Sequence, residues 1–238
     1  MHLYDHKAVV WDLDGTLYYQ RDMRIKMALS LVSYYLIRPH RIKELLAVKQ
    51  FRQIRESWKD EENTGDALKK AADGMMKGCV GLDELSALQY ARTAMDLKMK
   101  PEAVKAAVDM WIYERPLEII YSCRDEKAAD LIGELSKKGI ESYIFSDYPV
   151  EDKLKALKIQ GIKGSYAATD ERVGVLKPDP KGLNLLMEDH GYEPGDLIMI
   201  GDRMSRDGEA AKRAGCEFYI LSKSRIKRRK DYRILTGR

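Results

Sequence analysis

Residues 7–16 read Lys-Ala-Val-Val-Trp-Asp-Leu-Asp-Gly-Thr, and their pattern indicates the fold class of the chain. It begins as a short apolar run and ends in an acid, as a buried parallel β-strand does at the carboxyl edge of its sheet. Gly15, directly after the acids Asp12 and Asp14, lets the backbone turn sharply there. Because one parallel strand has no partner of its own, we expect the rest of its sheet elsewhere in the chain.

The region that follows, from about Arg24 to Glu114, carries apolar residues at helical spacings of three and four. Ile25, Leu29 and Val32 show this spacing near its start. The pattern predicts a block of helices between the first strand and the rest of the sheet. We expect residues 19–115 to form an inserted helical domain, with methionine and aromatic side chains in its core.

After Pro116 the sequence alternates between helical and extended patterns. Helices are predicted at residues 126–138, 150–158, 180–190 and 205–214, and strands at 141–146, 165–168, 197–200 and 217–221. Such alternation indicates a doubly wound parallel sheet with crossover helices. The predicted fold is therefore α/β, with residues 1–18 and 116–222 forming one core around the helical insertion.

Length and composition restrict the class of protein further. The 238 residues are 45% apolar, and 42 basic residues stand against 38 acidic ones, which suits a folded globular chain. The sequence has no apolar run of the ~18 residues that a membrane span needs, and its start lacks the layout of a signal peptide. Three widely spaced cysteines, Cys79, Cys123 and Cys216, form no disulfide framework or zinc motif. We expect a cytoplasmic monomer or homodimer without a membrane partner.

The net charge of +4 is concentrated at one end of the sequence. Residues 223–238 contain eight basic residues and one acid, Asp231, whereas the remaining sequence is slightly acidic. We interpret this segment as a basic C-terminal tail, a type of segment that can hold phosphates or anionic surfaces. Nucleic acid is therefore kept as an alternative partner, beside the simpler interpretation of a solvated helix end.

Polar side chains follow the predicted strands at the edge where ligands bind in open α/β sheets. Asp12 and Asp14 follow the first strand, Ser146 ends the second, and Asp202 follows a third. Carboxylates gathered at one edge repel one another unless a hard cation such as Mg²⁺ lies among them, and Asp12 and Asp202 are its natural ligands. Lys177 adds a positive charge suited to a phosphate. A carboxylate beside a bound phosphate can attack it, and a second acid two residues away can transfer protons.

Four motifs, in this order, resemble those of the haloacid dehalogenase superfamily. They are Asp-x-Asp-Gly-Thr at residues 12–16, Ile144-Phe145-Ser146-Asp147, Lys177-Pro178-Asp179-Pro180, and the Gly-Asp-x4-Asp pattern of residues 201–207. Each motif alone is weak, because Asp and Gly are common in turns, but four in order on predicted strand ends are specific. The resemblance covers about residues 7–18 and 117–222.

The resemblance implies a role for each matching residue. Asp12 would be the nucleophile that forms an aspartyl-phosphate, and Asp14 would be the general acid and then the general base. The implied phosphate-binding residues are Gly15, Thr16, Ser146 and Lys177, and the implied magnesium ligands are Asp12, Asp14 through its backbone carbonyl, Asp202 and Asp207. Asp207 has two further interpretations, as a support of Lys177 or as a cap of the helix predicted at residues 205–214.

The resemblance also narrows the reaction, since the family's dehalogenases lack an acid at the position of Asp14, whereas its phosphatases and phosphomutases have one. It implies a magnesium-dependent phosphatase beneath a closing helical cap at residues 19–115. The expected substrate is a small phosphorylated metabolite such as a sugar phosphate, phosphoglycolate or a nucleotide. Two alternatives stay open: a phosphomutase of the same fold, and a non-catalytic binding protein that uses the basic tail on nucleic acid.

Overall fold

The computed structural model describes residues 2–58 and 83–237. Cys79 and the part of the predicted helical insertion at residues 59–82 lie outside the described residues. The chain divides into two compact units. Unit 1 consists of Met1–Met23 with Ile120–Arg238, and unit 2 consists of Arg24–Ile119.

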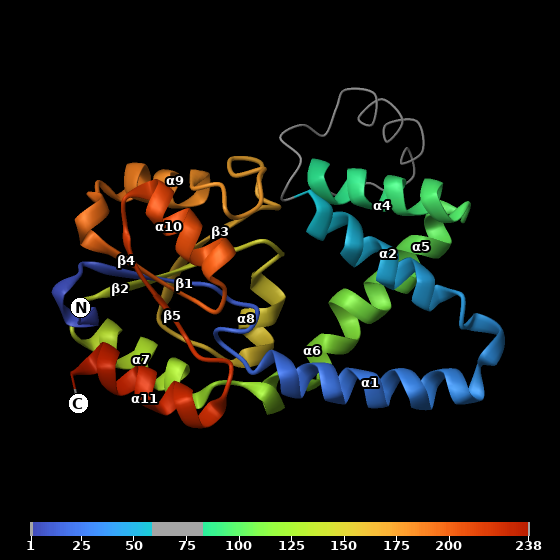
Figure 1. Ribbon diagram of the computed structural model, residues 1–238, viewed down its shortest axis with the longest axis horizontal. Helices are drawn as coiled ribbons and strands as arrows, with labels where there is room; N and C mark the ends of the chain where they lie inside the picture. Colours follow the sequence, from blue (N-terminus) through green and yellow to red (C-terminus); the bar gives the residue numbers. More distant parts are fainter. Residues whose placement is uncertain (1, 59–82, 238) are drawn as a thin grey trace. The chain divides into compact units, whose positions relative to one another are not determined.

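Unit 1 is built on a parallel β-sheet (Figure 1). Within residues 2–58 and 83–237 the sheet has five strands: β1 (Ala8–Trp11), β2 (Glu141–Ser146), β3 (Ile162–Ala167), β4 (Leu197–Gly201) and β5 (Glu217–Ile220). Their order is β3-β2-β1-β4-β5, and each neighbouring pair is parallel. The order changes direction at β1, so the loop after β1 lies at the switch point where such sheets bind ligands.

The strand predicted from residues 7–12 is the centre of the sheet. Val10 pairs with Tyr143 of β2 on one side and with Met199 of β4 on the other. All four side chains of β1 are fully buried, and complete burial of a large apolar side chain stabilises a fold by about 1.5–3 kcal/mol. This burial fixes the position from which Asp12 leaves the sheet.

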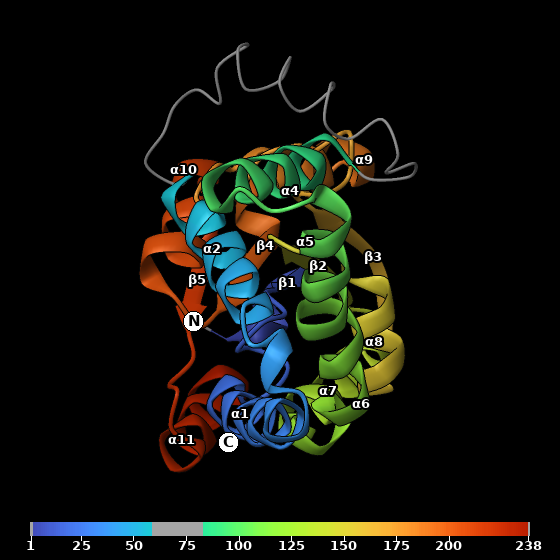
Figure 2. The same ribbon diagram turned by 90° about the vertical axis from the view of Figure 1, so that its right-hand side faces the viewer.

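Helices cover both faces of the sheet, which confirms the predicted doubly wound α/β fold. α9 and α10 lie over one face, and α7 and α11 lie over the other (Figures 1 and 2). The helices of unit 1 are α7 (Glu126–Lys137), α8 (Glu151–Leu157), α9 (Lys181–His190), α10 (Glu209–Ala214) and α11 (Arg225–Thr236), with 3₁₀ turns at Leu3–Asp5, Tyr121–Cys123 and Pro194–Asp196. Among the described residues, no helix is both long and apolar enough to span a bilayer.

Two local predictions need correction, one in unit 1 and one in unit 2. The helix predicted at 205–214 is divided, because Met204–Gly208 forms a π-helical turn before α10 begins. In that turn the Asp207 carboxylate accepts the backbone N–H groups of residues 202 and 203. A continuous α-helix from residue 205 did not predict these contacts. Pro116 does not end the helical region either, since it lies in the first turn of α6 (Arg115–Ile120), where its missing N–H costs nothing.

The segment predicted as a separate basic tail, residues 223–238, is part of unit 1. Its helix α11 buries Arg228, Tyr232 and Leu235, which fall on one face at spacings of four and three. The high density of charge did not predict this buried face, because most of the eight basic residues of the segment lie on the solvent side. Arg228 and Asp231 are charged and nevertheless buried.

Unit 2 is helical. Its described helices are α2 (Glu44–Ser57), α4 (Glu84–Leu97) and α5 (Pro101–Val108), with a π-helical turn at Asp109–Glu114 and a 3₁₀ turn at Pro39–Arg41, and α1 (Gln20–Ile37) and α6 link it to unit 1. Phe51 packs on Tyr90 with ring centroids 4.8 Å apart, and the buried Arg55 donates a 2.8 Å hydrogen bond to Gln89. These contacts place aromatic side chains in the core of the unit, as predicted.

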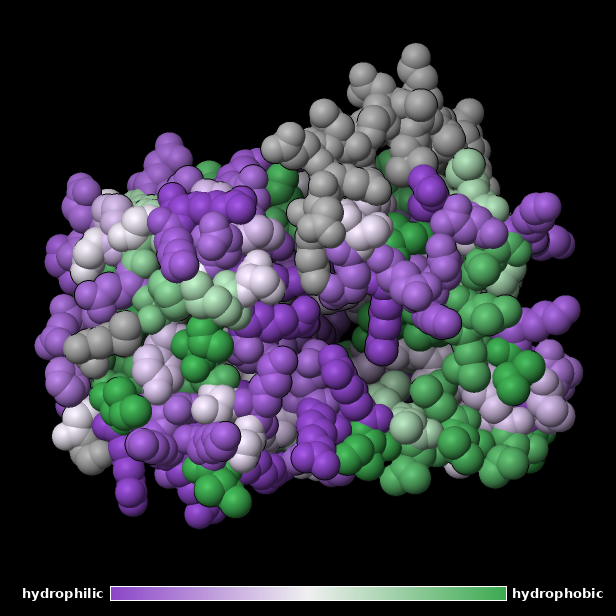
Figure 3. All heavy atoms as spheres, in the orientation of Figure 1, coloured by the Kyte–Doolittle hydropathy of each residue, from purple (hydrophilic) through white to green (hydrophobic). Residues whose placement is uncertain are grey.

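The apolar stripe of α1 is exposed, although its spacing correctly predicted a helix. Ile25, Leu29, Val32 and Leu36 are each more than half exposed. Figure 3 shows apolar side chains gathered along α1 on the surface of unit 2. Helical periodicity therefore identified the helix but not whether its apolar face is covered.

Close packing of α9 on the sheet gives a stability prediction. A Cβ atom on Gly182 would collide with the buried ring of Phe145, whereas one on the helical Gly133 would meet nothing within 4 Å. We expect Gly182→Ala to lower the free energy of unfolding by about 1–3 kcal/mol. The matched control Gly133→Ala should raise it by about 0.5–1 kcal/mol. Denaturant unfolding of both variants tests this, and an unchanged midpoint for Gly182→Ala would contradict the packing described.

Candidate active site

The carboxyl edge of the sheet carries a cavity whose walls come from the ends of β1, β2 and β4 and from the loop that precedes α9. The described residues that line it are Asp12, Asp14, Asp147, Tyr148, Lys177, Asp202, Arg203, Arg206 and Asp207. Most of the residues predicted from the sequence as catalytic or charged are in this list. The parallel sheet brings them together because it places all its strand ends at one edge.

Asp12 is held on both of its carboxylate oxygens. Its backbone N–H donates to Ile200 at 2.8 Å, which continues the pairing with β4 past the end of β1. Oδ1 accepts a 2.6 Å hydrogen bond from Lys177 Nζ, and Oδ2 accepts a 2.9 Å bond from the Thr16 hydroxyl. Burial raises the pKa of Asp12 to about 7 against the opposing charge of Lys177. The carboxylate is thus fixed in one orientation at the cavity wall.

Lys177 is the centre of a buried ion-pair cluster. Its side chain is 2% exposed, and its ammonium lies 2.6 Å from Asp12 Oδ1, 2.6 Å from Asp207 Oδ1 and 3.2 Å from the carbonyl of Phe145. Burial opposes its charge, but the neighbouring carboxylates of Asp12 and Asp207 hold the pKa of Lys177 above its usual value. Lys177 is therefore a cation at all ordinary pH values.

Asp207 supports this lysine and the loop after β4. Its second oxygen, Oδ2, accepts the backbone N–H groups of Asp202 at 3.1 Å and Arg203 at 3.0 Å. Of the interpretations left open by the sequence, these contacts match the support of Lys177. Asp207 does not cap α10, because Gly208 holds the cap position and the carboxylate oxygens of Asp207 bind Lys177 and the N–H groups of Asp202 and Arg203.

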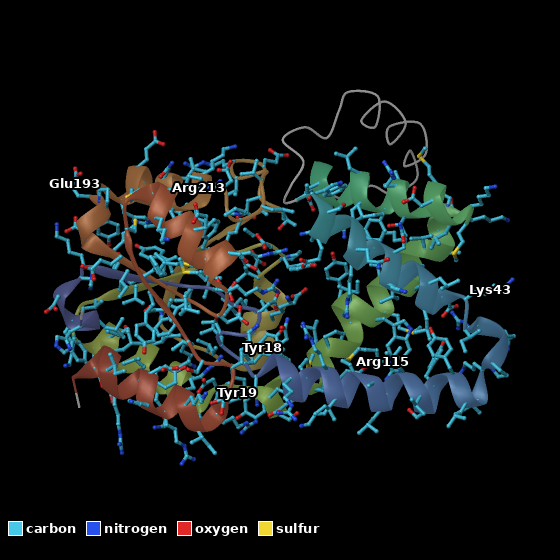
Figure 4. All side chains as sticks on the ribbon, in the orientation of Figure 1. Tyr18, Tyr19, Lys43, Arg115, Glu193 and Arg213 are labelled. Carbon is cyan, nitrogen blue, oxygen red and sulfur yellow. The ribbon has the colours of Figure 1, made fainter. Side chains whose placement is uncertain are left out.

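Asp14 has partners that the sequence analysis did not identify. Lys153 Nζ on α8 donates to both of its carboxylate oxygens, at 2.6 and 2.7 Å, and the Tyr18 hydroxyl donates at 2.7 Å. Burial alone would raise the pKa of Asp14, but the Lys153 ammonium outweighs it and the pKa is lowered. Tyr18, labelled in Figure 4, follows Asp14 by four residues, and that spacing was the available signal for its contact.

Two further charged residues link the loops around the cavity. The guanidinium of Arg206 donates to Asp147 in a buried ion pair, and Asp147 Oδ1 accepts the backbone N–H of Lys177 at 2.8 Å. Both residues lie next to motif positions in the sequence, and that adjacency was the only signal for them. Their contacts tie the loop after β2 to the loop that carries Lys177.

Three of the predicted phosphate-binding residues lie beside the cavity rather than on its wall. Ser146 is buried, and its Oγ accepts the backbone N–H of Tyr148 at 3.1 Å, so it stabilises the turn after β2. Gly15 has a φ of +105°, and a Cβ atom there would lie 2.5 Å from Asp202 Oδ2. Glycine is therefore required for the loop after β1 to approach the end of β4. Thr16 is buried with its hydroxyl on Asp12.

The donor set at the edge fits a hard divalent cation. Asp12, Asp202 and Asp207 each offer a carboxylate oxygen, and these atoms lie within 4.8 Å of one another. Burial raises the pKa of Asp202 above its usual value. The positive charge of Arg203 lowers this pKa in part, and the negative charge of Asp207 raises it further. Lys177 and Arg203, whose Nε lies 3.6 Å from Asp202 Oδ1, supply two positive charges against three carboxylates, and oxygen ligands of this kind suit Mg²⁺. Asp14 was predicted as a ligand through its backbone carbonyl, and its carboxylate is bound by Lys153 and Tyr18.

Comparison with known proteins agrees with this geometry. Residues 6–215 match the family described as haloacid dehalogenase-like hydrolase. A 46-residue stretch is 46% identical to phosphoglycolate phosphatase of Vibrio vulnificus (strain YJ016). That stretch is 19% of this chain and 20% of the relative, so the match spans about a fifth of the curated relative's length.

Solved structures share the fold at low sequence identity. A 2-haloacid dehalogenase from Pseudomonas syringae pv. Tomato DC3000 aligns with a TM-score of 0.59 at 18% identity, over 91% of this chain and 86% of that one. YfnB from Bacillus subtilis, described as a HAD-hydrolase bound to magnesium, aligns with a TM-score of 0.59 at 16% identity, over 97% and 98% of the two chains. Both show that this chain shares its fold with solved structures.

The carboxylate cluster yields a prediction about Mg²⁺ and stability. Because repulsion and burial disfavour the charge of Asp202, we expect Asp202→Asn to raise the melting temperature in EDTA. In excess Mg²⁺ the wild type should gain about 2.7 kcal/mol at a concentration 100 times its Kd, and the variant should lose most of that gain. The control Asp152→Asn changes an exposed acid on α8 and should keep the full stabilisation by Mg²⁺. An equal Mg²⁺-dependent shift in thermal unfolding of wild type and Asp202→Asn would refute this assignment.

Proposed function

Because the chain belongs to the haloacid dehalogenase-like hydrolase family, we propose that it is a magnesium-dependent phosphatase that hydrolyses a small phosphate monoester. One observation carries the proposal. The Asp12 carboxylate is fixed between Lys177 and Thr16 at the cavity wall, and a second acid, Asp14, follows two residues later. A fixed carboxylate beside a buried cation is suited to attack a phosphoryl group, and the second acid is suited to proton transfer.

In the first step an oxygen of Asp12 forms a bond to phosphorus while the bond from phosphorus to the ester oxygen breaks. The leaving alcohol takes a proton from Asp14. Lys177 compensates the negative charge of the phosphoryl oxygens from within 2.6 Å of Asp12. Asp12 and Asp202 would hold a Mg²⁺ ion, which would neutralise charge on the phosphate and align it.

In the second step water attacks the aspartyl-phosphate on Asp12. The Asp14 carboxylate, ionised after the first step, accepts the proton of the attacking water, and the Asp12–phosphate bond breaks to release inorganic phosphate. Lys153 and Tyr18 hold the Asp14 carboxylate during this exchange. The products are the alcohol and phosphate, and Asp12 and Asp14 return to their starting states.

Phosphatase chemistry is favoured over the other reactions considered. The dehalogenase likeness is one of fold at 18% identity, and Asp14 is the acid that halide displacement does not need. Hydrolysis requires only water, whereas a phosphomutase must provide a second sugar site. The phosphoglycolate phosphatase match, although short, supports a small substrate such as phosphoglycolate, a sugar phosphate or a nucleotide. Unit 2 would act as the cap that selects it.

The test is phosphate release from a panel of these esters, with Mg²⁺ and with EDTA. Asp12→Asn keeps the shape of the side chain but removes the nucleophilic charge, so we expect kcat to fall by at least ~10³-fold. Asp130→Asn, at an exposed position of α7, is the matched control and should retain wild-type kcat. Turnover by Asp12→Asn close to that of the control would rule out the proposed nucleophile.

A second prediction concerns pH. Lys153 lowers the pKa of Asp14, whereas burial raises the pKa of Asp12 to about 7, so on lowering the pH Asp12 takes up its proton first and Asp14 takes up the second. Lys153→Gln removes the cation and should raise the pKa of Asp14, so we expect the acid limb of the kcat/KM profile to move to higher pH. Lys155→Gln changes an exposed lysine on the same helix and should leave the profile unchanged. Superimposable profiles for wild type and Lys153→Gln would show that Lys153 does not tune Asp14.

A further inference from the structure

Arg228 is a buried arginine on α11, a helix that lies beyond the 6–215 match to the family. Its side chain is 2% exposed, although it lies in the most basic part of the sequence. Burying a guanidinium is costly unless its donors are satisfied. The partners of Arg228 therefore show why this position carries an arginine.

The partners are backbone carbonyls of the catalytic loop, defined here as residues 12–17. Nη2 donates to the Gly15 carbonyl at 2.8 Å, and Nη1 donates to the Thr16 carbonyl at 3.1 Å. Nε donates to the carbonyl of Ser222 at 2.8 Å, which fixes the guanidinium itself. The planar fork of an arginine can hold two successive carbonyls in this way, whereas the ammonium of a lysine cannot reproduce the geometry.

These two carbonyls belong to the Gly15–Thr16 and Thr16–Leu17 peptide units, the second and third peptide units after Asp14. Gly15 has a φ of +105°, a region open to glycine and costly for other residues, so this backbone has wide conformational freedom. Holding both carbonyls removes that freedom. Thr16 then transmits the restraint, because its hydroxyl donates to Asp12 Oδ2 at 2.9 Å. A continuous set of hydrogen bonds therefore leads from Arg228 to the proposed nucleophile.

Arg228 also binds one carboxylate, that of Asp125. Asp125 Oδ2 lies 3.2 Å from Arg228 Nη1 and accepts the Tyr232 hydroxyl at 2.9 Å, so two residues of α11 bind it. The backbone N–H of Asp125 donates to the Leu17 carbonyl at 2.9 Å, next to the carbonyls that Arg228 holds. The Arg225 guanidinium also lies over the ring of Tyr19, 4.2 Å from its centroid. Figure 4 labels Tyr19 beside the end of α11.

We propose that Arg228 is a positioning residue that sets the conformation of the catalytic loop, which makes α11 a required part of the active site. Its role in turnover rests on the proposed phosphatase function, whereas its hold on the loop does not. Arg228 touches no reacting atom. It acts through Thr16 on the orientation of Asp12 and through Gly15 on the peptide after Asp14.

The experiment compares Arg228→Lys and Arg228→Ala with the control Arg229→Ala, an exposed arginine on the same helix. Arg228→Lys keeps a positive charge beside Asp125, so it is the variant expected to fold if Arg228→Ala does not. Two readouts are measured in the full chain: hydrogen exchange of the Thr16 and Leu17 amides, and kcat and KM for the best ester of the panel. Methylguanidinium is added to Arg228→Ala as a chemical rescue.

We expect Arg228→Lys to speed exchange at Thr16 and Leu17 by about tenfold or more, with the amides of β4 unchanged, since only the loop is released. We expect kcat to fall about 10- to 100-fold with KM within about threefold, because a misplaced nucleophile affects the chemical step most. Methylguanidinium should restore part of the kcat of Arg228→Ala. Arg229→Ala should match the wild type in both readouts.

Wild-type exchange and kcat in folded Arg228→Lys would overturn the proposal, and so would faster exchange spread evenly over the sheet, which would indicate a general loss of stability. Faster loop exchange with unchanged kcat would overturn the positioning role. If the wild type turned over no ester, the phosphatase function would fail instead. Hydrogen exchange would still test whether Arg228 restrains the loop, and unchanged exchange of the Thr16 amide in Arg228→Lys would overturn that restraint.

Discussion

The buried contact between Lys177 and the carboxylates of Asp12 and Asp207 is the interaction on which the site depends. Three acids cannot stay ionised within 4.8 Å of one another in a buried environment without positive charge among them. Lys177 supplies one charge at 2.6 Å from two of the acids, and the remaining negative charge suits a divalent cation. The same lysine is bound through its backbone to Asp147, so the loops around the cavity are fixed by the cluster that they surround.

The sheet holds the charged groups of this cluster in place, so little conformational freedom is left for the cluster itself to restrict. β1 is paired on both sides and fully buried, so Asp12 leaves a rigid element. Two glycines then allow close approach: a Cβ on Gly15 would meet Asp202, and a Cβ on Gly201 would meet Asp207. Short rigid strands followed by small residues thus place charged groups nearer together than flexible loops would hold them.

The strands, the α/β class and the order of the acids could be predicted, because apolar runs and strand-end residues are local signals. The haloacid dehalogenase resemblance rested on the same local motifs, and the family match over residues 6–215 confirms it. Lys153 on Asp14 and Arg228 on Gly15 were not predicted, since neither Lys153 nor Arg228 lies in one of the four motifs and each contact joins residues more than a hundred positions apart. The exposure of the apolar stripe of α1 could not be predicted either. Periodicity identifies an apolar face, but tertiary packing decides what covers that face.

The contact between Arg228 and Thr16 joins residues 212 positions apart, and this separation affects when the site forms. Closing so long a stretch of chain costs conformational entropy, and the pairing of Ala8 with Leu197 between β1 and β4 carries a similar cost. The restraint on the loop that carries Asp12 is complete only when both the sheet and α11 are in place. Catalytic competence is thereby coupled to completion of the fold, so a partly folded chain would hold its reactive carboxylate in an unproductive orientation.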